Sequence, residues 1–345
     1  MPTLKGLATG IGSLPHKDAE SALDLIFKHL PEIPFWPQLP KRDIREGMIA
    51  QFSENLPFLK VNKDGLKFSI PAPKDKELEL FYEKIIANDT DYFKISEEFA
   101  AGLHRFYQRL ENSHLGDIEF IKCQVTGPFT FAASIKDDLG TPLLHDAVLL
   151  QAILKGLAMK ANWQINLFRK FAKKIILFFD EPFLSCFGSA YTPINREGVV
   201  SALSELTETV KADDVLLGIH CCGNTDWSMF MDVSGIDIIS FDAFDFLDRL
   251  VLYDDELKGF LKRGGILCWG IVPTQLFTGE ENAQLIIRKI KEGINRLEAK
   301  GIEEDLLLNN LLISPSCGLG TFTPEKSEKI FKLLSETSSI IREYE

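Results

Sequence analysis

The sequence of 345 residues has no uncharged apolar run close to the ~20 residues that a membrane-spanning helix needs. Its first residues, Met-Pro-Thr-Leu-Lys-Gly, lack the apolar core of a signal peptide. The six cysteines are scattered over a long chain and do not form the pattern of a disulfide framework. We therefore expect a cytoplasmic protein that does not act at a membrane.

Basic residues are also in short supply, because 38 lysines and arginines face 50 aspartates and glutamates, for a net charge of -12. A nucleic-acid binder neutralises phosphates with a basic surface, so this charge balance excludes that class. The first apolar run is not followed by a Gly-x-Gly-x-x-Gly turn, which disfavours dinucleotide binding. The remaining composition, 45% hydrophobic and 26% charged, is typical of a globular protein with a large core.

Apolar segments that predict strands alternate with segments of helical periodicity along most of the chain. This alternation is typical of a parallel sheet covered by helices on both faces. Eight strands favour a closed (β/α)8 TIM barrel built from residues 1–345 as a single domain, with a hairpin and helical excursion after the second strand. An open doubly wound sheet is the alternative. The expected strands span 7–11, 35–40, 118–125, 174–179, 215–222, 236–242, 265–270 and 311–313.

Polar residues stand directly after six of these apolar segments. The carboxyl ends of the strands of a TIM barrel meet on one rim, where the active sites of this fold are built. We therefore expect these side chains to gather around one site. They are Ser13, Thr126, Asp180 with Glu181, His220 with Cys222, Asp242, and Cys317.

The pattern His-Cys-Cys at 220–222 indicates a metal site. Successive side chains of an extended segment point to opposite faces, so His220 and Cys222 share one face and Cys221 takes the other. Imidazole and thiolate are the ligands that zinc prefers, and Cys317 adds a third. Asp242 is a further ligand, a partner that orients the imidazole, or a helix cap. The alternative for His220 and Cys222 is a hydrogen-bonded histidine beside a buried thiol.

Two carboxylates at 180–181 are the candidate catalytic groups. Asp180 would hold a substrate ammonium group, and Glu181 would orient its neighbours. The alternative for both is a helix-capping turn, which Asp and the following Pro182 favour. Ser13 either caps a helix or presents its hydroxyl and nearby backbone N–H groups to a substrate carboxylate.

Five short motifs stand along the chain: Ile-Gly-Ser-Leu-Pro at 11–15, Thr-Gly-Pro-Phe-Thr at 126–130, Asp-Glu-Pro at 180–182, His-Cys-Cys at 220–222 and Ser-Pro-Ser-Cys-Gly-Leu at 314–319. Together they resemble the C-terminal catalytic barrel of cobalamin-independent methionine synthase. The wider superfamily contains uroporphyrinogen decarboxylase and the corrinoid-specific methyltransferases. The resemblance implies a (β/α)8 barrel and zinc-dependent transfer of a methyl group to the sulfur of homocysteine, giving methionine.

The resemblance also assigns roles to residues. It implies zinc ligands at His220, Cys222 and Cys317, and it puts Asp242 where the family has a glutamate ligand. It implies that homocysteine is bound at Ser13, beside Gly12, and at Asp180. For the family's further substrate-binding glutamate, Glu46 and Gln38 are the candidates.

Two methyl donors, methyl-folate and a methylcorrinoid, are candidates. The family's acid histidine has no counterpart at 272–275, and a methyl-folate needs its leaving nitrogen protonated. A methylcorrinoid, delivered by a corrinoid protein, is therefore as plausible a donor as methyl-folate. The alternatives are a corrinoid-specific methyltransferase acting on another thiol such as a coenzyme, a metal-free uroporphyrinogen decarboxylase-like enzyme, and a zinc-stabilised scaffold that binds a corrinoid protein.

Overall fold

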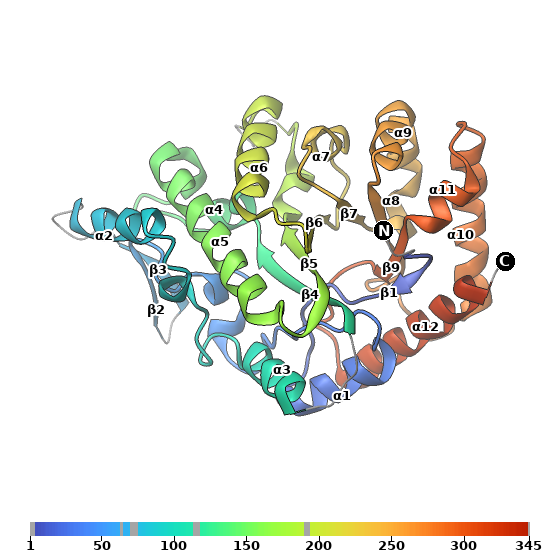
Figure 1. Cartoon of the computed structure of the whole chain (residues 1–345), viewed down its shortest axis with the longest axis horizontal. Helices are drawn as coiled ribbons and strands as arrows, with labels where there is room; N and C mark the ends of the chain where they lie inside the picture. The colour runs from blue at the N-terminus through green and yellow to red at the C-terminus, as the bar shows by residue number, and fades with distance from the viewer. Residues whose placement is uncertain (1–3, 63–64, 70–74, 113–117, 190–193, 344–345) are drawn as a thin grey trace.

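A curled parallel sheet of seven strands forms the centre of the molecule, in the order β1-β9-β8-β7-β6-β5-β4 (Figure 1). This computed structural model describes residues 4–62, 65–69, 75–112, 118–189 and 194–343. The architecture is α/β and TIM-barrel-like, with helices around the outside of the sheet. The strands are β1 (Leu7–Ala8), β4 (Ile118–Thr126), β5 (Ala172–Asp180), β6 (Val215–Cys221), β7 (Ile238–Phe241), β8 (Ile266–Val272) and β9 (Leu311–Pro315).

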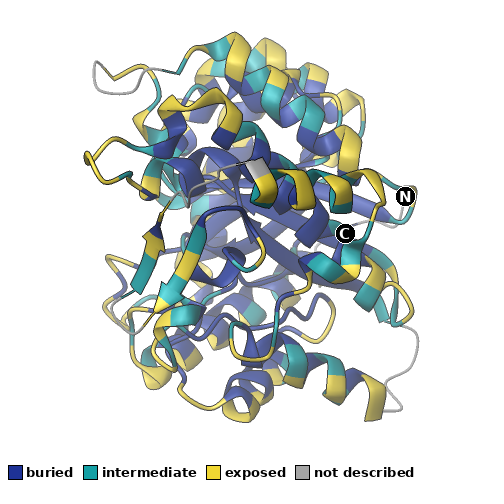
Figure 2. Cartoon of the chain, turned by 90° about the vertical axis from the view of Figure 1, so that its left-hand side faces the viewer, coloured by how far each residue is buried: buried dark blue, intermediate teal, exposed yellow. Residues whose placement is uncertain are grey.

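The core lies between the sheet and the helices and inside the curl of the sheet. Every residue of β6, β7, β8 and β9 is buried, as expected for parallel strands that are covered on both faces. Figure 2 shows this buried centre, with exposed residues on the outer surfaces of the helices. The near-continuous apolar composition of these segments therefore explains why they form strands.

The helices bury one apolar stripe each. In α10, for example, Ile286, Ile290 and Gly293 recur at helical spacing and are buried. No helix in the described ranges is long and apolar enough to cross a membrane. The helices outside the excursion are α1 (Ala19–His29), α4 (Pro128–Ser134), α5 (Ala147–Phe168), α6 (Arg196–Val210), α7 (Ser228–Asp232), α8 (Ala243–Leu250), α9 (Asp254–Lys262), α10 (Ala283–Glu298), α11 (Glu304–Asn309) and α12 (Pro324–Glu343).

Seven of the eight expected strands are confirmed, whereas 35–40 forms no regular strand. This segment lies between the two edges of the sheet and makes one parallel bridge to each side, from Phe35 to Lys122 and from Gln38 to Ser13. Prolines at 34, 37 and 40 have no N–H to donate, so a continuous ladder cannot form. Seven regular strands therefore form the curled sheet, in place of the eight expected of a closed (β/α)8 barrel.

The predicted excursion is present. It contains an antiparallel hairpin of β2 (Leu59–Asn62) and β3 (Gly65–Phe68), followed by α2 (Asp75–Ile86) and α3 (Ala101–Asn112). Residues 63–64 of the expected turn lie outside the described ranges. Residues 43–55 contain two short 3-10 turns, Ile44–Glu46 and Ala50–Phe52.

Candidate metal and substrate site

Three of the four predicted metal ligands lie together at the carboxyl ends of β6 and β9. His220 is on β6, Cys222 follows that strand directly, and Cys317 follows β9. One ligand atom from each of the three residues lies within 4.8 Å of the other two. We call His220, Cys222 and Cys317 the three-ligand group.

The local sequence explains how β6 presents this group. A Cβ at Gly218 would lie 2.4 Å from the Phe178 ring, so glycine lets β5 and β6 pack closely just before His220. Cys221 is buried on the other face, with its thiol 3.5 Å from the carbonyl oxygen of Gly223. The alternation of an extended strand therefore separates Cys221 from its two neighbours, as the sequence predicts.

Ser240 fixes the orientation of the His220 ring. The two residues are paired across β6 and β7, and the His220 Nδ1 lies 2.9 Å from the Ser240 Oγ. The other ring nitrogen, Nε2, is buried and has no hydrogen-bond partner among the described residues. A histidine that binds metal through one nitrogen commonly uses the other for such a bond. Ser240 is not among the residues predicted from the sequence, although a serine within the apolar segment 236–241 is a signal that could identify it.

The two thiols of the group lie within 4.8 Å of each other, and each shifts the pKa of the other. A hydrogen bond from Cys222, reinforced by the His220 imidazole, lowers the pKa of Cys317 to about 4. The same contact with Cys317 raises the pKa of Cys222. Two cysteine sulfurs and an imidazole nitrogen without a hydrogen-bond partner among the described residues are the donors that zinc prefers. The residues present therefore fit a zinc ion.

The three-ligand group opens onto a cavity of about 600 Å³. This volume is in the range of small-molecule sites and exceeds that needed by one amino acid. The polar part of its lining comes from segments that are far apart in sequence but meet at this rim. Besides the group itself, that part includes Ser13, Gln38, Lys41, Glu46, Asp180, Gln275 and Thr321.

Two buried carboxylates in the lining each have an unused oxygen. Asp180 ends β5 beside His220, and burial raises its pKa to about 6. Glu46 pairs with Arg42 through one oxygen, and burial raises its pKa to about 7. Asp180 Oδ1 and Glu46 Oε2 are buried without a hydrogen-bond partner among the described residues. Both can therefore accept hydrogen bonds from a bound cation such as an ammonium group.

Ser13 lines the cavity, and Gly12 precedes it in the chain. The Ser13 hydroxyl accepts a hydrogen bond of 3.2 Å from the backbone N–H of Gly320. Gly12 does not itself line the cavity, but a Cβ there would lie 2.7 Å from Oε1 of Gln38. Gly12 therefore allows Gln38 to approach, and Ser13 supplies the exposed polar atom.

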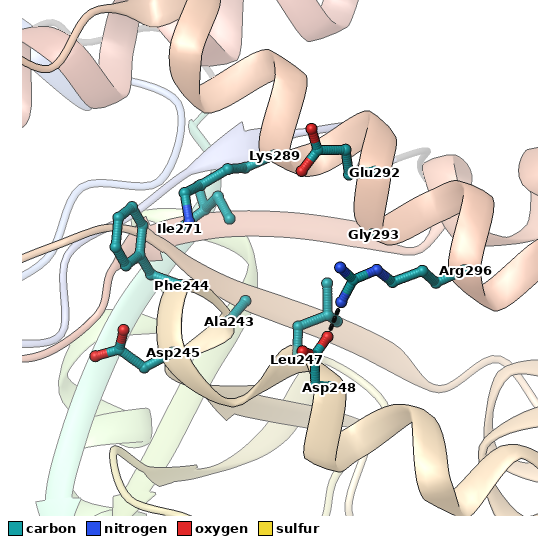
Figure 3. Close-up of a pocket in the computed structure, with 10 residues that line it drawn as sticks. All are labelled: Ala243, Phe244, Asp245, Leu247, Asp248, Ile271, Lys289, Glu292, Gly293 and Arg296. Carbon is teal, nitrogen blue, oxygen red and sulfur yellow. Dashed lines mark ion pairs between the residues drawn. The ribbon is translucent and has the colours of Figure 1, made fainter.

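Asp242, the fourth predicted ligand, lies outside the three-ligand group. Its carboxylate caps α8 by accepting a hydrogen bond of 3.1 Å from the backbone N–H of Asp245. Figure 3 shows the start of this helix, where Phe244 packs under Lys289 of α10 in a pocket of about 140 Å³. The hydrogen bond to Asp245 is the helix cap that was the alternative role for Asp242. Direct metal ligation by Asp242 stays a prediction.

Glu181 is fully buried and does not line the cavity. Its carboxylate accepts hydrogen bonds from the backbone N–H groups of Phe129 and Thr130, at 2.9 and 2.8 Å, and from the Thr130 hydroxyl at 2.6 Å. A Cβ at Gly127 would lie 2.3 Å from this side chain, which explains the glycine. Burial raises the pKa of Glu181 to about 7, and the hydrogen bonds oppose that rise. The contacts are those of a residue that fixes the first turn of α4.

The substitution Glu181→Gln separates this structural role from the catalytic role that the sequence suggested. In the glutamine variant, an NH2 group replaces one carboxylate oxygen and therefore faces N–H or O–H groups that also donate. We expect a loss of about 1–3 kcal/mol of unfolding free energy, measured by denaturant titration. Metal content and turnover should stay within about threefold of the wild type, since no cavity atom changes. A loss of turnover above about a hundredfold at unchanged stability would instead favour the catalytic role.

Fold and site together define a TIM-barrel-like α/β protein with a histidine and two cysteines at its carboxyl rim. No protein-family model matches the sequence, and no curated protein matches it. Among solved structures, the chain is similar to a B12-independent methionine synthase from Shewanella sp. W3-18-1 in complex with selenomethionine. The TM-score is 0.55 at 15% identity, over 99% of this chain and 98% of that one.

A second similar structure comes from Listeria monocytogenes and is described as a putative vitamin B12-independent methionine synthase. Its TM-score is 0.53 at 16% identity, over 94% of this chain and 85% of that one. At these identities the comparisons establish the shared fold. They also agree with the family that the five sequence motifs resemble.

Proposed function

We propose that the protein is an S-methyltransferase that transfers a methyl group to homocysteine, giving methionine. One observation favours this function above the others. The three-ligand group faces the same cavity as two buried carboxylates, Asp180 and Glu46, whose free oxygens suit an amino-acid ammonium group. A thiol-bearing amino acid matches both halves of this lining. Similarity in fold to two methionine synthases supports the proposal.

In this proposal His220, Cys222 and Cys317 hold a zinc ion. A bound zinc ion would supply deprotonation of the substrate thiol, whose free pKa of about 8.5 leaves it mostly protonated at neutral pH. Ser240 holds the His220 ring so that Nε2 faces the group. The contact with Cys222 lowers the pKa of Cys317, which favours Cys317 as a thiolate ligand.

The remaining wall residues bind and orient the acceptor. Asp180 and Glu46 accept hydrogen bonds from its ammonium group, and Ser13 with the nearby backbone faces its carboxylate. Charge-assisted hydrogen bonds of this kind are the strong ones in a partly dry site. Glu181 does not contact the acceptor in this proposal. It fixes the start of α4, where the backbone N–H of Gly127 donates to the carbonyl oxygen of Asp180.

Residues 1–345 act as one domain in this proposal, and the segment 34–38 takes the place of the eighth strand of a closed barrel. The two bridges of that segment, one to each edge of the sheet, support this closure. The cavity lining within the described ranges contains no arginine, the residue that a porphyrinogen decarboxylase needs for its substrate carboxylates. Decarboxylation is therefore the weaker assignment.

The methyl donor is left to experiment. Both similar structures are described as B12-independent enzymes, so nothing in the comparisons supports a corrinoid partner. The loop after β8 contributes Gln275 to the cavity, and an amide does not protonate a leaving nitrogen. Methyl-folate and methylcobalamin should therefore be offered separately to the zinc-loaded protein.

The test of the function is methyl transfer to homocysteine, with 4-mercaptobutanoate as the matched acceptor that lacks the amino group. We expect methionine to form with one of the two donors, and kcat/KM to be roughly 100-fold lower for the analogue. Zinc-loaded protein that methylates neither acceptor with either donor would refute the proposal. Equal rates on both acceptors would refute the role of the two carboxylates.

A further inference from the structure

A buried polar network joins the two edges of the sheet where the eighth regular strand is missing. Across this seam, which we define as segments 11–14 and 34–38 with β4, backbone pairing is sparse. Gln38 N–H donates to Gly12 O at 3.0 Å, Leu14 N–H donates to Gln38 O at 2.9 Å, and Lys122 N–H donates to Pro34 O at 2.9 Å. Side chains must supply the rest of the cohesion.

Glutamines supply part of it. The Gln124 amide donates to the carbonyl oxygen of Trp36 at 2.9 Å. The Trp36 indole N–H donates to the side-chain oxygen of Gln164 at 2.8 Å. The side-chain NH2 of Gln164 in turn donates to the backbone carbonyl oxygen of Gln124 at 3.1 Å. Gln38, which lines the cavity, donates to Gln51 at 2.7 Å. Each of these buried amides therefore ties the irregular segment to its surroundings.

Lys122 links this network to the cavity wall. It is fully buried on β4, and its ammonium group donates to the carbonyl oxygen of Ile11 and, at 3.1 Å, to Gln124 Oε1. The ammonium also lies 4.8 Å from the centre of the Phe178 ring. Burying a cation without a carboxylate partner in hydrogen-bond contact is costly, so its fixed contacts must compensate. The Ile11 carbonyl immediately precedes Gly12 and Ser13.

We propose that Lys122 is a positioning residue for the proposed reaction. Its ammonium group holds the turn at 11–13 directly and holds the segment 36–38 through Gln124. These contacts keep Ser13 and Gln38 facing the methyl acceptor. Lys122 does not line the cavity, so it would not contact the methyl acceptor directly. Its effect should therefore fall on acceptor binding. This inference rests on the proposed function for its kinetic readout and on the seam alone for its structural readout.

The chain offers a matched control in Lys160. This lysine is also fully buried, and its ammonium also donates to a backbone carbonyl, that of Phe93, at 3.3 Å. Burial lowers the pKa of both lysines to about 8. Lys160 lies on α5 outside the cavity lining and the seam. Lys122→Met and Lys160→Met therefore remove the same kind of group at two places.

The kinetic test compares the two variants with zinc bound. We expect Lys122→Met to raise the KM for homocysteine about tenfold while kcat stays within about twofold, because a charged hydrogen bond that orders the wall is lost. Lys160→Met should leave KM unchanged even though it also lowers stability. If Lys122→Met folds poorly, Gln124→Met tests the same link, with an expected rise in KM of about threefold.

The structural test is amide hydrogen exchange at Leu14 and Gln38, whose N–H groups bridge the seam. Exchange should become at least about tenfold faster in Lys122→Met and stay at the wild-type rate in Lys160→Met. An unchanged KM in an active Lys122→Met enzyme, or seam exchange equal in the two variants, overturns the positioning role. Failure of the wild type to methylate homocysteine refutes the proposed function, and hydrogen exchange then still decides whether Lys122 holds the seam.

Discussion

Replacement of Cys317 by serine is expected to reduce bound zinc from about one ion per chain to less than about a tenth of that, as measured by elemental analysis after gel filtration. Turnover should fall by roughly a thousandfold or more, because the thiol of the acceptor is no longer activated. Cys317 contributes one of the two sulfurs of the three-ligand group, and serine replaces that sulfur with a hydroxyl that stays protonated at neutral pH. Cys222→Ser should behave in the same way.

Cys221→Ser is the matched control for this experiment. Cys221 adjoins Cys222 in sequence, but it is buried on the opposite face of β6 and points to the carbonyl of Gly223. The variant should keep its zinc and lose stability modestly, by about 1 kcal/mol. Loss of zinc in Cys221→Ser but not in Cys317→Ser would refute the site. Removal of metal by a chelator should reproduce the activity loss of Cys317→Ser, and added zinc should reverse it.

The second large effect is expected from Asp180→Asn. The amide has nearly the shape of the carboxylate but no charge, so it loses the charge-assisted hydrogen bond to the acceptor ammonium. We expect the KM for homocysteine to rise roughly 10- to 100-fold, with zinc content unchanged because Asp180 is not in the three-ligand group. Initial rates over a range of homocysteine concentrations measure this effect.

The acceptor analogue 4-mercaptobutanoate provides the control for Asp180. It has no amino group, so Asp180→Asn should change its KM by less than about twofold. An equal rise for homocysteine and the analogue would mean that Asp180 acts on the metal site or the wall and not on the ammonium group. Retained affinity for both acceptors would remove Asp180 from substrate binding altogether.

The regular strands and the position of the candidate site could be predicted from the sequence because parallel strands leave a simple pattern. The apolar segments at 215–222 and 311–313 ended at soft ligands, and the fold requires such ends to meet. The alternation rule was also sufficient to separate Cys221 from Cys222. These inferences needed only local composition and one rule of topology.

Other features depended on contacts that local composition does not encode. Segment 35–40 has strand-like composition, but its prolines prevent a continuous ladder of backbone hydrogen bonds. Side-chain hydrogen bonds hold the segment instead, and one of them comes from a residue as distant as Gln164. Glu181 carries the same charge as Asp180, yet the N–H groups at 129–130 draw it away from the cavity. Long-range geometry decides such roles, which explains why Lys122 and Ser240 were not predicted.

The pairing of β1 with β9 has a consequence for synthesis of the chain. Leu7 pairs with Leu312, so β1 gains this sheet neighbour only after the residues between the two strands have been made. At ~5–20 residues per second, this interval on the ribosome is roughly 15–60 s. During that time the first apolar segment has no partner strand on that side. Chaperone dependence of the nascent protein should therefore be concentrated in its first residues, and a circular permutant that begins at β4 should need less assistance.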